Sequence, residues 1–157
     1  MEPSLERLLV PQKFIPNYDP DAAKKAKIGI LVAEDDLDVA QLVDATLRNI
    51  GIIRISHAGH GRDALKMYTR NPNDFDLIIS DWEMPEMTGI ELLRAIHNVA
   101  PNIPFLMLTA RVQVDAVLTA KEADVTDFIA KPFSPANLRR KLESVITYTH
   151  AKMAPPS

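Results

Sequence analysis

The sequence predicts an α/β fold, a doubly wound five-stranded parallel sheet with helices on both faces. Between residues 28 and 149, five short apolar runs alternate with five segments in which apolar residues recur at helical spacing. Strands that alternate with helices pair in parallel through right-handed crossovers, so that helices cover both faces of the sheet. The chain of 157 residues is long enough for one such domain with a sizeable core.

Each strand is followed by a helix in the expected order. The first apolar run, IGILVA, precedes a segment in which Val39, Val43, Leu47 and Ile50 repeat on one helical face. Asp36 comes directly before that helix and is expected to cap its first turn. The same pattern recurs four times. The predicted strands are 28–33, 52–56, 75–80, 103–108 and 125–130, and the predicted helices are 39–50, 61–70, 89–99, 112–123 and 134–149.

Two of the helix starts carry more specific signals. Thr88 and Glu91 have the spacing of a capping box, in which each side chain accepts a hydrogen bond from the backbone of the other residue. Ser134 and Pro135 combine an N-cap residue with proline at the first helical position. These signals place two helix starts independently of the hydrophobic pattern.

Residues 1–26 differ from the rest and are predicted to form an N-terminal arm. Four prolines occur by Pro20, so that no regular structure is expected beyond a short turn around Leu5–Val10. The arm is nevertheless apolar enough to dock on a second copy of the chain, giving a homodimer, or on a partner. The domain is expected to span residues 27–150, with a disordered tail at 151–157. The apolar residues of the arm are Leu5, Leu8, Leu9, Val10, Phe14, Ile15 and Tyr18.

The composition excludes several classes of function. The net charge is −3 and no Lys/Arg cluster of nucleic-acid-binding type occurs, so nucleic acid is not an expected partner. The chain has no cysteine, which excludes disulfides, thiolate metal sites and thiol catalysis. No apolar run could span a bilayer, and the acidic N-terminus does not resemble a signal peptide. We therefore expect a cytoplasmic location and no membrane partner.

Polar residues gather where the predicted strands end. Glu34 and Asp35 follow the first strand, and Asp81 ends the third. Thr109 follows the fourth strand, and Lys131 follows the fifth. In a doubly wound sheet the carboxyl ends of the strands share one edge, where ligands bind. We therefore expect these five side chains to face one crevice.

The chemistry of this set favours a metal ion and a phosphoryl group. Two carboxylates ~4 Å apart repel by about 4 kcal/mol at an effective dielectric of ~20, so the acids must protonate, separate or bind a cation. Oxygen ligands suit Mg²⁺, with Mn²⁺ as a second candidate. Lys131 and Thr109 suit phosphoryl oxygens. A carboxylate beside the metal can attack phosphorus, which makes Asp81 the candidate nucleophile.

These residues resemble the receiver domain of two-component response regulators, in its stand-alone, chemotaxis-regulator-like form. The motifs ILVAEDD, LIISDWEMPEMTG, FLMLTA and FIAKPF occur in the order of that family and at close to its spacings. The resemblance covers about Ile28–Thr149 and rests on the four motifs together, since each alone is weak. It implies the flavodoxin-like strand order 2-1-3-4-5.

The resemblance also implies roles in phosphoryl transfer. Asp81 would accept the phosphoryl group, and Lys131 would hold its oxygens. Thr109 would be the switch hydroxyl, and Phe128 matches an aromatic residue that turns inward on activation. Bonds before proline are cis in only ~5% of cases, and the resemblance raises that proportion for the bond between Lys131 and Pro132.

The metal site follows from the same resemblance. Glu34 and Asp35 match the acidic pair of the family, and Asp81 completes the side-chain ligands. Glu83 matches the position whose backbone carbonyl binds the metal. The charged side chains of Glu83 and Arg111 depart from the family pattern and are expected to affect how water reaches an acyl phosphate.

The expected function is that of a phosphoacceptor signalling protein rather than an enzyme. A sensor histidine kinase or a histidine phosphotransfer protein would supply the phosphoryl group. Autocatalytic, Mg²⁺-dependent phosphorylation and dephosphorylation would be the only reactions. The signal would leave by contact of a downstream protein with the face formed by the fourth and fifth helices.

Three alternatives remain open at this point. Gly59-x-Gly61-x-x-Ala64 has the form of a dinucleotide fingerprint and would fit a Rossmann-type nucleotide-binding enzyme. A phosphatase of the haloacid-dehalogenase type would need aspartate where Glu83 lies. A receiver-like scaffold that is never phosphorylated is the third alternative, although every matched position is filled.

Overall fold

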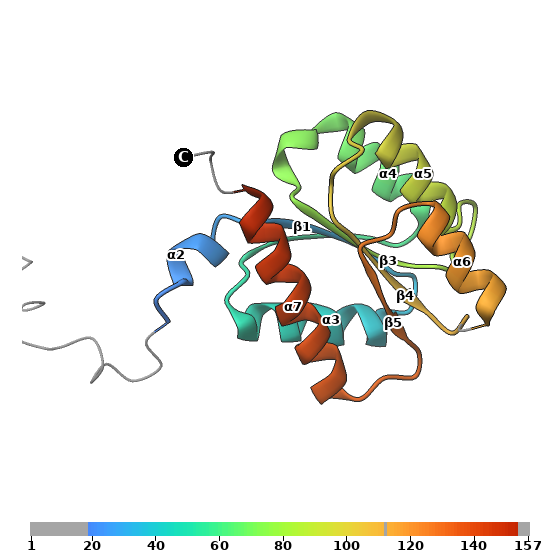
Figure 1. Cartoon of the computed structure of the whole chain (residues 1–157). Helices are drawn as coiled ribbons and strands as arrows, with labels where there is room; N and C mark the ends of the chain where they lie inside the picture. The colour runs from blue at the N-terminus through green and yellow to red at the C-terminus, as the bar shows by residue number, and fades with distance from the viewer. Residues whose placement is uncertain (1–18, 112, 154–157) are drawn as a thin grey trace, which may run out of the picture.

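The computed structural model describes residues 19–111 and 113–153. These residues form one parallel sheet in the order β2-β1-β3-β4-β5, which confirms the expected topology (Figure 1). The register pairs Ala33 with Ser80 and Asp81 with Leu108, so the strands end at nearly the same level. The strands are β1 (Gly29–Ala33), β2 (Arg54–Ala58), β3 (Leu77–Asp81), β4 (Phe105–Thr109) and β5 (Asp127–Ala130).

Helices cover both faces of the sheet, as Figure 1 shows. One face carries α3 (Leu37–Ile50) and α7 (Pro135–Met153), which pack against each other. The other face carries α4 (Gly61–Arg70), α5 (Gly89–Val99) and α6 (Val114–Glu122). Two short elements precede strands: the helix α2 (Ala22–Lys25) and the 3₁₀ turn η2 (Pro72–Asp74). Within the described residues, no helix is both long and apolar enough to cross a membrane.

Each face of the sheet has its own apolar core. The strands β1, β3 and β4 are buried along their whole lengths, which explains why their sequences are continuously apolar. In β1, Ile30 and Val32 face the core under α3 and α7, whereas Leu31 and Ala33 face the core under the other helices. The two-residue alternation of side chains thus divides each central strand between two cores.

The helix starts expected from the sequence are confirmed. Asp36 caps α3, because its Oδ1 accepts two backbone amides at 2.9 and 3.3 Å. Thr88 and Glu91 form the capping box of α5, with contacts of 2.9 and 3.2 Å. The Oγ of Ser134 accepts an amide at 3.0 Å at the start of α7. Each cap satisfies an amide that the first helical turn leaves without a partner.

Four strands begin two residues later than the sequence predicts. Apolar residues before these strands fill the core without joining the ladder. Ile52 is fully buried, for example, yet its amide donates to the carbonyl of Leu47 at the end of α3, at 3.0 Å. The amide of Ile103 donates to Ala100 in the same way, at 3.2 Å. The apolar sequence runs therefore predicted which residues are buried, but not which of them pair in the sheet.

The two chain ends also differ from the predictions. The expected lack of regular structure in the arm is wrong for Ala22–Lys25, which form a helical turn beside an ion pair of 2.9 Å between Lys25 and Asp19. The predicted disordered tail is wrong for residues 151–153, which continue α7. The expected turn at Leu5–Val10, residue 112 and residues 154–157 lie outside the described residues. The division into arm, domain and tail stays a prediction.

Gly89 sets how closely α5 approaches the end of β3. A Cβ at this position would lie 2.4 Å from the carbonyl oxygen of Asp81 and 2.7 Å from the sulfur of Met107. We expect Gly89→Ala to lower the free energy of unfolding by about 1–3 kcal/mol, because the backbone must shift. Urea unfolding measures this loss.

Gly59→Ala provides a matched control for that substitution. A Cβ at Gly59 would meet nothing within 4 Å, so the free energy of unfolding should change by less than about 0.5 kcal/mol. Equal losses in the two variants would show that the close approach at Gly89 is not the cause.

Candidate functional site

The carboxyl edge of the sheet gathers three acidic side chains. Glu34 and Asp35 follow β1, and Asp81 ends β3. One carboxylate oxygen from each lies within 4.8 Å of the others. Glu34 and Asp81 are buried, with exposures of 3% and 6%, whereas Asp35 is exposed. The acids that the sequence placed at one edge therefore do lie together.

Backbone contacts hold the two buried acids in place. The amide of Glu34 donates to the carbonyl of Ala58 in the neighbouring strand, at 3.1 Å. The Oε2 of Glu34 accepts the amide of Asp36 at 3.1 Å, and the Oδ1 of Asp81 accepts the amide of Glu83 at 3.4 Å. Because Asp36 also caps α3, the start of this helix helps to orient Glu34.

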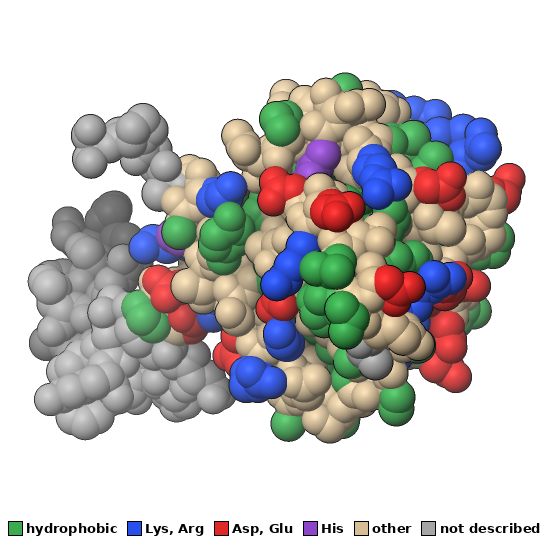
Figure 2. All heavy atoms as spheres, turned by 45° about the vertical axis from the view of Figure 1, so that its right-hand side comes forward, with side chains coloured by type: hydrophobic (Ala, Val, Ile, Leu, Met, Phe, Trp, Pro, Cys, Tyr) green, Lys and Arg blue, Asp and Glu red, His purple; other side chains and the backbone are tan. Residues whose placement is uncertain are grey.

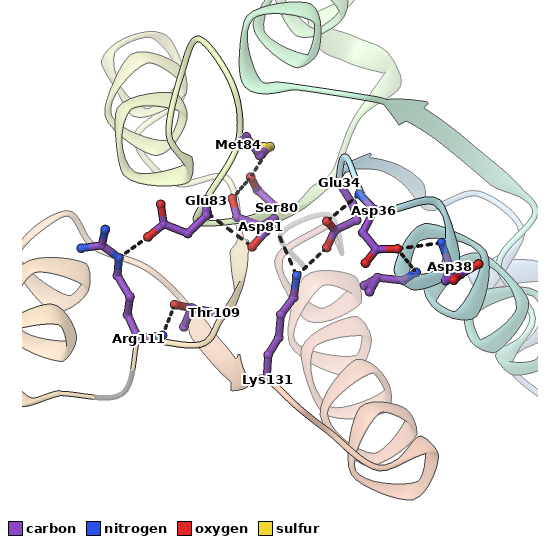
Figure 3. Close-up of polar contacts among 11 residues, drawn as sticks. Glu34, Asp36, Asp38, Ser80, Asp81, Glu83, Met84, Thr109, Arg111 and Lys131 are labelled. Atoms are coloured by element: carbon purple, nitrogen blue, oxygen red, sulfur yellow. Dashed lines mark hydrogen bonds and ion pairs between the residues drawn. The ribbon is translucent and has the colours of Figure 1, made fainter.

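Lys131 reaches both buried acids from the end of β5. Its Nζ lies 2.9 Å from Oε1 of Glu34 and 3.3 Å from Oδ2 of Asp81 (Figure 3). Its own amide donates to the carbonyl of Thr109 at 2.7 Å, and its peptide bond to Pro132 is cis. Lys131 is thus held at both ends, by β4 through its backbone and by the acids through its ammonium group.

Burial and charge act in opposite directions on these groups. Burial raises the pKa of the Glu34 carboxyl to about 7 and Asp81 adds to the increase, although hydrogen bonds from Lys131 and the Asp36 amide oppose it. Burial alone would lower the pKa of Lys131. The hydrogen bond and charge of Glu34, together with Asp81, outweigh burial, so the pKa of Lys131 is raised. The ammonium therefore stays protonated between the acids.

The donor set fits a hard divalent cation. Glu34, Asp35 and Asp81 supply only oxygen ligands, which Mg²⁺ and Mn²⁺ prefer. Lys131 offers a single positive charge to these acids, so a divalent ion would reduce their remaining repulsion. The exposed side of the cluster at Asp35 leaves room for water or a further oxygen ligand.

A second set of side chains borders the site on the β4 side. Thr109 is buried, and its Oγ1 accepts the amide of Arg111 at 2.7 Å. The guanidinium of Arg111 pairs with Glu83 and lies 5.5 Å from the centre of the Trp82 ring. Figure 3 shows that the Glu83 side chain extends toward Arg111 beside Asp81. The expected binding of metal by the carbonyl of Glu83 stays a prediction.

Phe128 lies apart from the acidic cluster. It is half-buried in β5, pairs in register with Met107 and packs against the core under α4, α5 and α6. These contacts place it in β5, two strands away from Asp81 in β3. Its role as a switch residue stays a prediction.

Two residues that support Asp81 were missed in the sequence analysis. The hydroxyl of Ser80 is fully buried and donates to the carbonyl of Asp81 at 2.8 Å. Gly89 lies against the same carbonyl. A serine within an apolar strand and a glycine directly after the capping residue Thr88 were the available signals, but neither reveals its partner.

Comparison of this chain with known proteins identifies its family. The model of the response regulator receiver domain matches residues 30–143, a range that includes every residue of the acidic cluster. The chain belongs to the receiver domain family of response regulators. Members of this family are signalling proteins, and they bind Mg²⁺ at an acidic site.

Chemotaxis proteins are among the relatives that match this chain over most of their own length. The chain is 34% identical over 118 residues to the chemotaxis protein CheY of Pseudomonas aeruginosa, covering 74% of this chain and 94% of that protein. It is 33% identical over 127 residues to CheY-3 of Vibrio cholerae, covering 80% and 96%. The solved structure of the response regulator CheY4 of Vibrio cholerae superimposes with a TM-score of 0.69 at 32% identity, covering 75% and 98% of the two chains.

The dinucleotide alternative gains no support from its glycines. A Cβ at Gly59 would meet nothing within 4 Å, so no close backbone approach requires glycine there. A Cβ at Gly61 would lie 2.6 Å from the carbonyl oxygen of Met87, which explains this glycine by the packing of α4. The family match accounts for the sheet edge without a nucleotide.

Lys131 should contribute to the free energy of unfolding, because its ammonium group lies between two buried acids. We expect Lys131→Met to lower the free energy of unfolding by about 1–3 kcal/mol when a chelator is present, because the carboxylates lose their buried partner. Urea unfolding at pH 8 measures this loss. Adding Glu34→Gln to the variant should recover part of it, since one of the two repelling charges is removed.

Lys141→Met is the matched control. Its ammonium pairs with Asp127 at 3.0 Å on a part-exposed surface, where such pairs contribute roughly 0.2–1 kcal/mol. A loss in Lys131→Met no larger than in Lys141→Met would contradict a structural role for the buried cation.

Proposed function

We propose that this protein receives a phosphoryl group on Asp81 from a phosphohistidine. The observation that carries the proposal is the convergence of Glu34, Asp35 and Asp81 with the Lys131 ammonium at one edge of a receiver fold. The donor would be a sensor histidine kinase or a histidine phosphotransfer protein. The expected cytoplasmic location and the stand-alone form stay predictions.

The reaction is a displacement at phosphorus. An oxygen of the Asp81 carboxylate attacks, a new O–P bond forms, and the N–P bond of the donor histidine breaks with its electron pair returning to the imidazole. Asp81 suits the nucleophile because it ends β3 and the Glu83 amide fixes its Oδ1. Positioning of this kind supplies much of the rate increase in phosphoryl transfer.

The residues around Asp81 would stabilise the transferred group. Lys131 already lies 3.3 Å from Asp81, so its ammonium can contact a phosphoryl oxygen after a small movement. Glu34, Asp35 and Asp81 would hold Mg²⁺, with the Glu83 carbonyl as a further ligand. The ion would neutralise negative charge on the phosphoryl oxygens. The same groups would support the autocatalytic gain and loss of the phosphoryl group.

Phosphorylation would change the surface through Thr109. A phosphoryl group adds about −1.5 to −2 charge at neutral pH. The Thr109 hydroxyl, whose oxygen accepts the Arg111 amide, would donate its proton in a hydrogen bond to the phosphoryl group, and Phe128 in the next strand would follow. The partner face would lie on α6 and α7, and two apolar residues of α6, Val114 and Leu118, are exposed there. Protein contact suits this output, since Figure 2 shows charges of both signs interspersed on the face it displays.

Intact-mass measurement tests the acceptor directly. After incubation with acetyl phosphate and Mg²⁺, the wild-type chain should gain the mass of one phosphoryl group, because Asp81 is the nucleophile. Asp81→Asn should gain none. Asp124→Asn, which changes an exposed aspartate away from the site, should label as the wild type does.

The outcomes separate the proposal from its alternatives. If Asp81→Asn gained a phosphoryl group to the same extent as the wild type, the acceptor would be another residue. Failure of the folded wild type to label, even with a phosphohistidine donor, would favour the scaffold alternative.

The ion pair between Arg111 and Glu83 should prolong the life of the acyl phosphate. It borders Asp81 and packs on Trp82, so it restricts the approach of water. We expect Arg111→Ala to speed loss of the phosphoryl group at least about threefold, or ~0.7 kcal/mol in the barrier. Time-resolved intact mass after removal of the donor measures the rate. Arg94→Ala, on the exposed side of α5, is the control, and equal rates in both would contradict this role.

A further inference from the structure

Three hollows lie in a row along the amino edge of the sheet, opposite the acidic site. The first, about 240 Å³, is lined by Ile53, Asp74 and Phe75, among others. The second, about 430 Å³, shares Phe75 with the first. The third, about 350 Å³, shares Asn102 and Ile103 with the second. Neighbouring hollows share lining residues and are therefore adjacent, and we call the three together the amino-edge furrow.

The furrow runs across the sheet from β2 to β5. Its walls come from β2, from the segments that lead into β2, β3, β4 and β5, and from the last turns of α4, α5 and α7. Parallel strands lie about 4.8 Å apart, so five strands give a width of roughly 20 Å. The furrow is therefore long enough for a peptide segment rather than a small molecule.

Apolar side chains are exposed at each part of the furrow. Ile53 lines the first hollow with 61% of its surface exposed. Met153 lines the second with 37% exposed, and Tyr148 lines the third with 44% exposed. These are three of the eight large apolar residues that are exposed in the described part of the chain. A row of exposed apolar residues is typical of a surface that another segment covers.

The described part of the chain begins beside this furrow. Asp19 and Lys25 lie against Gly51, two residues before Ile53 of the first hollow. The amide of Gly29, at the start of β1, donates to Asp76 of the second hollow at 2.8 Å. Figure 1 shows α2 and the last turn of α7 on the side of the sheet where β1 begins. Asp19, the first described residue, therefore lies at the amino edge.

We propose that residues 5–18 of this chain occupy the amino-edge furrow of the same molecule. The segment has fourteen residues and can span up to about 45 Å when extended, more than twice the width of the sheet. Phe14, Ile15 and Tyr18 are nearest to Asp19 and would cover the first two hollows. Leu5–Val10 would reach the third, beside Tyr148.

The same molecule is the favoured occupant because the segment is tethered at the furrow. Tethering converts docking into an intramolecular event with a local concentration in the millimolar range for short linkers. A second copy would have to supply the same segment from dilute solution. The exposed apolar residues would then be covered without forming a dimer.

The absence of cysteine in the chain allows a clean test by spin labelling. Ser144 lines the third hollow and is exposed, so Ser144→Cys carries the label at the furrow. When the protein also carries an NMR isotope, the spin label should broaden the NMR signals of the backbone amides of residues 5–10. The same label at Gln113→Cys, an exposed residue at the carboxyl edge, should leave those signals sharp.

A substitution within the segment separates docking from chance proximity. Phe14→Ser combined with Ile15→Ser should restore sharp signals in residues 5–10, because the apolar anchors are lost. Deletion of residues 1–18 should shift the amide signals of Ile53, Ile103 and Tyr148 while leaving those of Asp81 and Lys131 unchanged. Both variants leave the described domain intact.

A mixed sample decides between the two occupants. Spin-labelled Ser144→Cys chains without isotope are mixed with isotope-labelled wild-type chains. Sharp signals in the mixture, together with broadened signals in the single-chain experiment, support docking within one molecule. Broadening in the mixture would overturn it in favour of a second copy, and sharp signals in both experiments would show that the furrow does not bind this segment.

Discussion

The arrangement of this protein depends on one electrostatic constraint, the placement of two buried carboxylates within reach of one ammonium group. Glu34 and Asp81 come from neighbouring strands, and their burial would be costly without a positive partner. Lys131 supplies that partner from the end of β5, two strands away from Asp81. The three groups therefore hold the carboxyl ends of β1, β3 and β5 in a fixed relation, in addition to the apolar core.

The fold allows the two buried carboxylates to lie beside the ammonium group. The central strands are buried on both faces, which leaves their carboxyl ends as the place where polar side chains can lie together. The loops after the strands then supply the supports: Asp36 caps α3 and orients Glu34, and Gly89 lets α5 start against the carbonyl of Asp81. Helix starts and site geometry are therefore parts of the same local structure.

The residues alone were sufficient to predict the alternation of strands and helices, the helix starts and the acidic cluster, because strand ends, caps and charged residues are local features. The order of the strands in the sheet came from the family resemblance. The sequence could not give the strand starts, since Ile52 and Ile103 are as apolar as strand residues but bond to the preceding turn. Nor could it reveal that Ser80 supports Asp81 or that Glu83 pairs with Arg111. These contacts join residues whose separation in space depends on the packed fold, and no local pattern encodes it.

The outer side of the edge strand β2 affects how these molecules behave at high concentration. Within the described chain, β2 pairs only with β1, so the other side of β2 presents unpaired backbone groups. An unpaired strand edge of this kind can form hydrogen bonds with a strand of another molecule, which leads to aggregation. Here Arg54 and His57 are exposed on β2, and Arg54 also binds the carbonyls of Lys27 and Asp74. Charged and polar side chains that remain exposed on an edge strand oppose the pairing of a further strand with it.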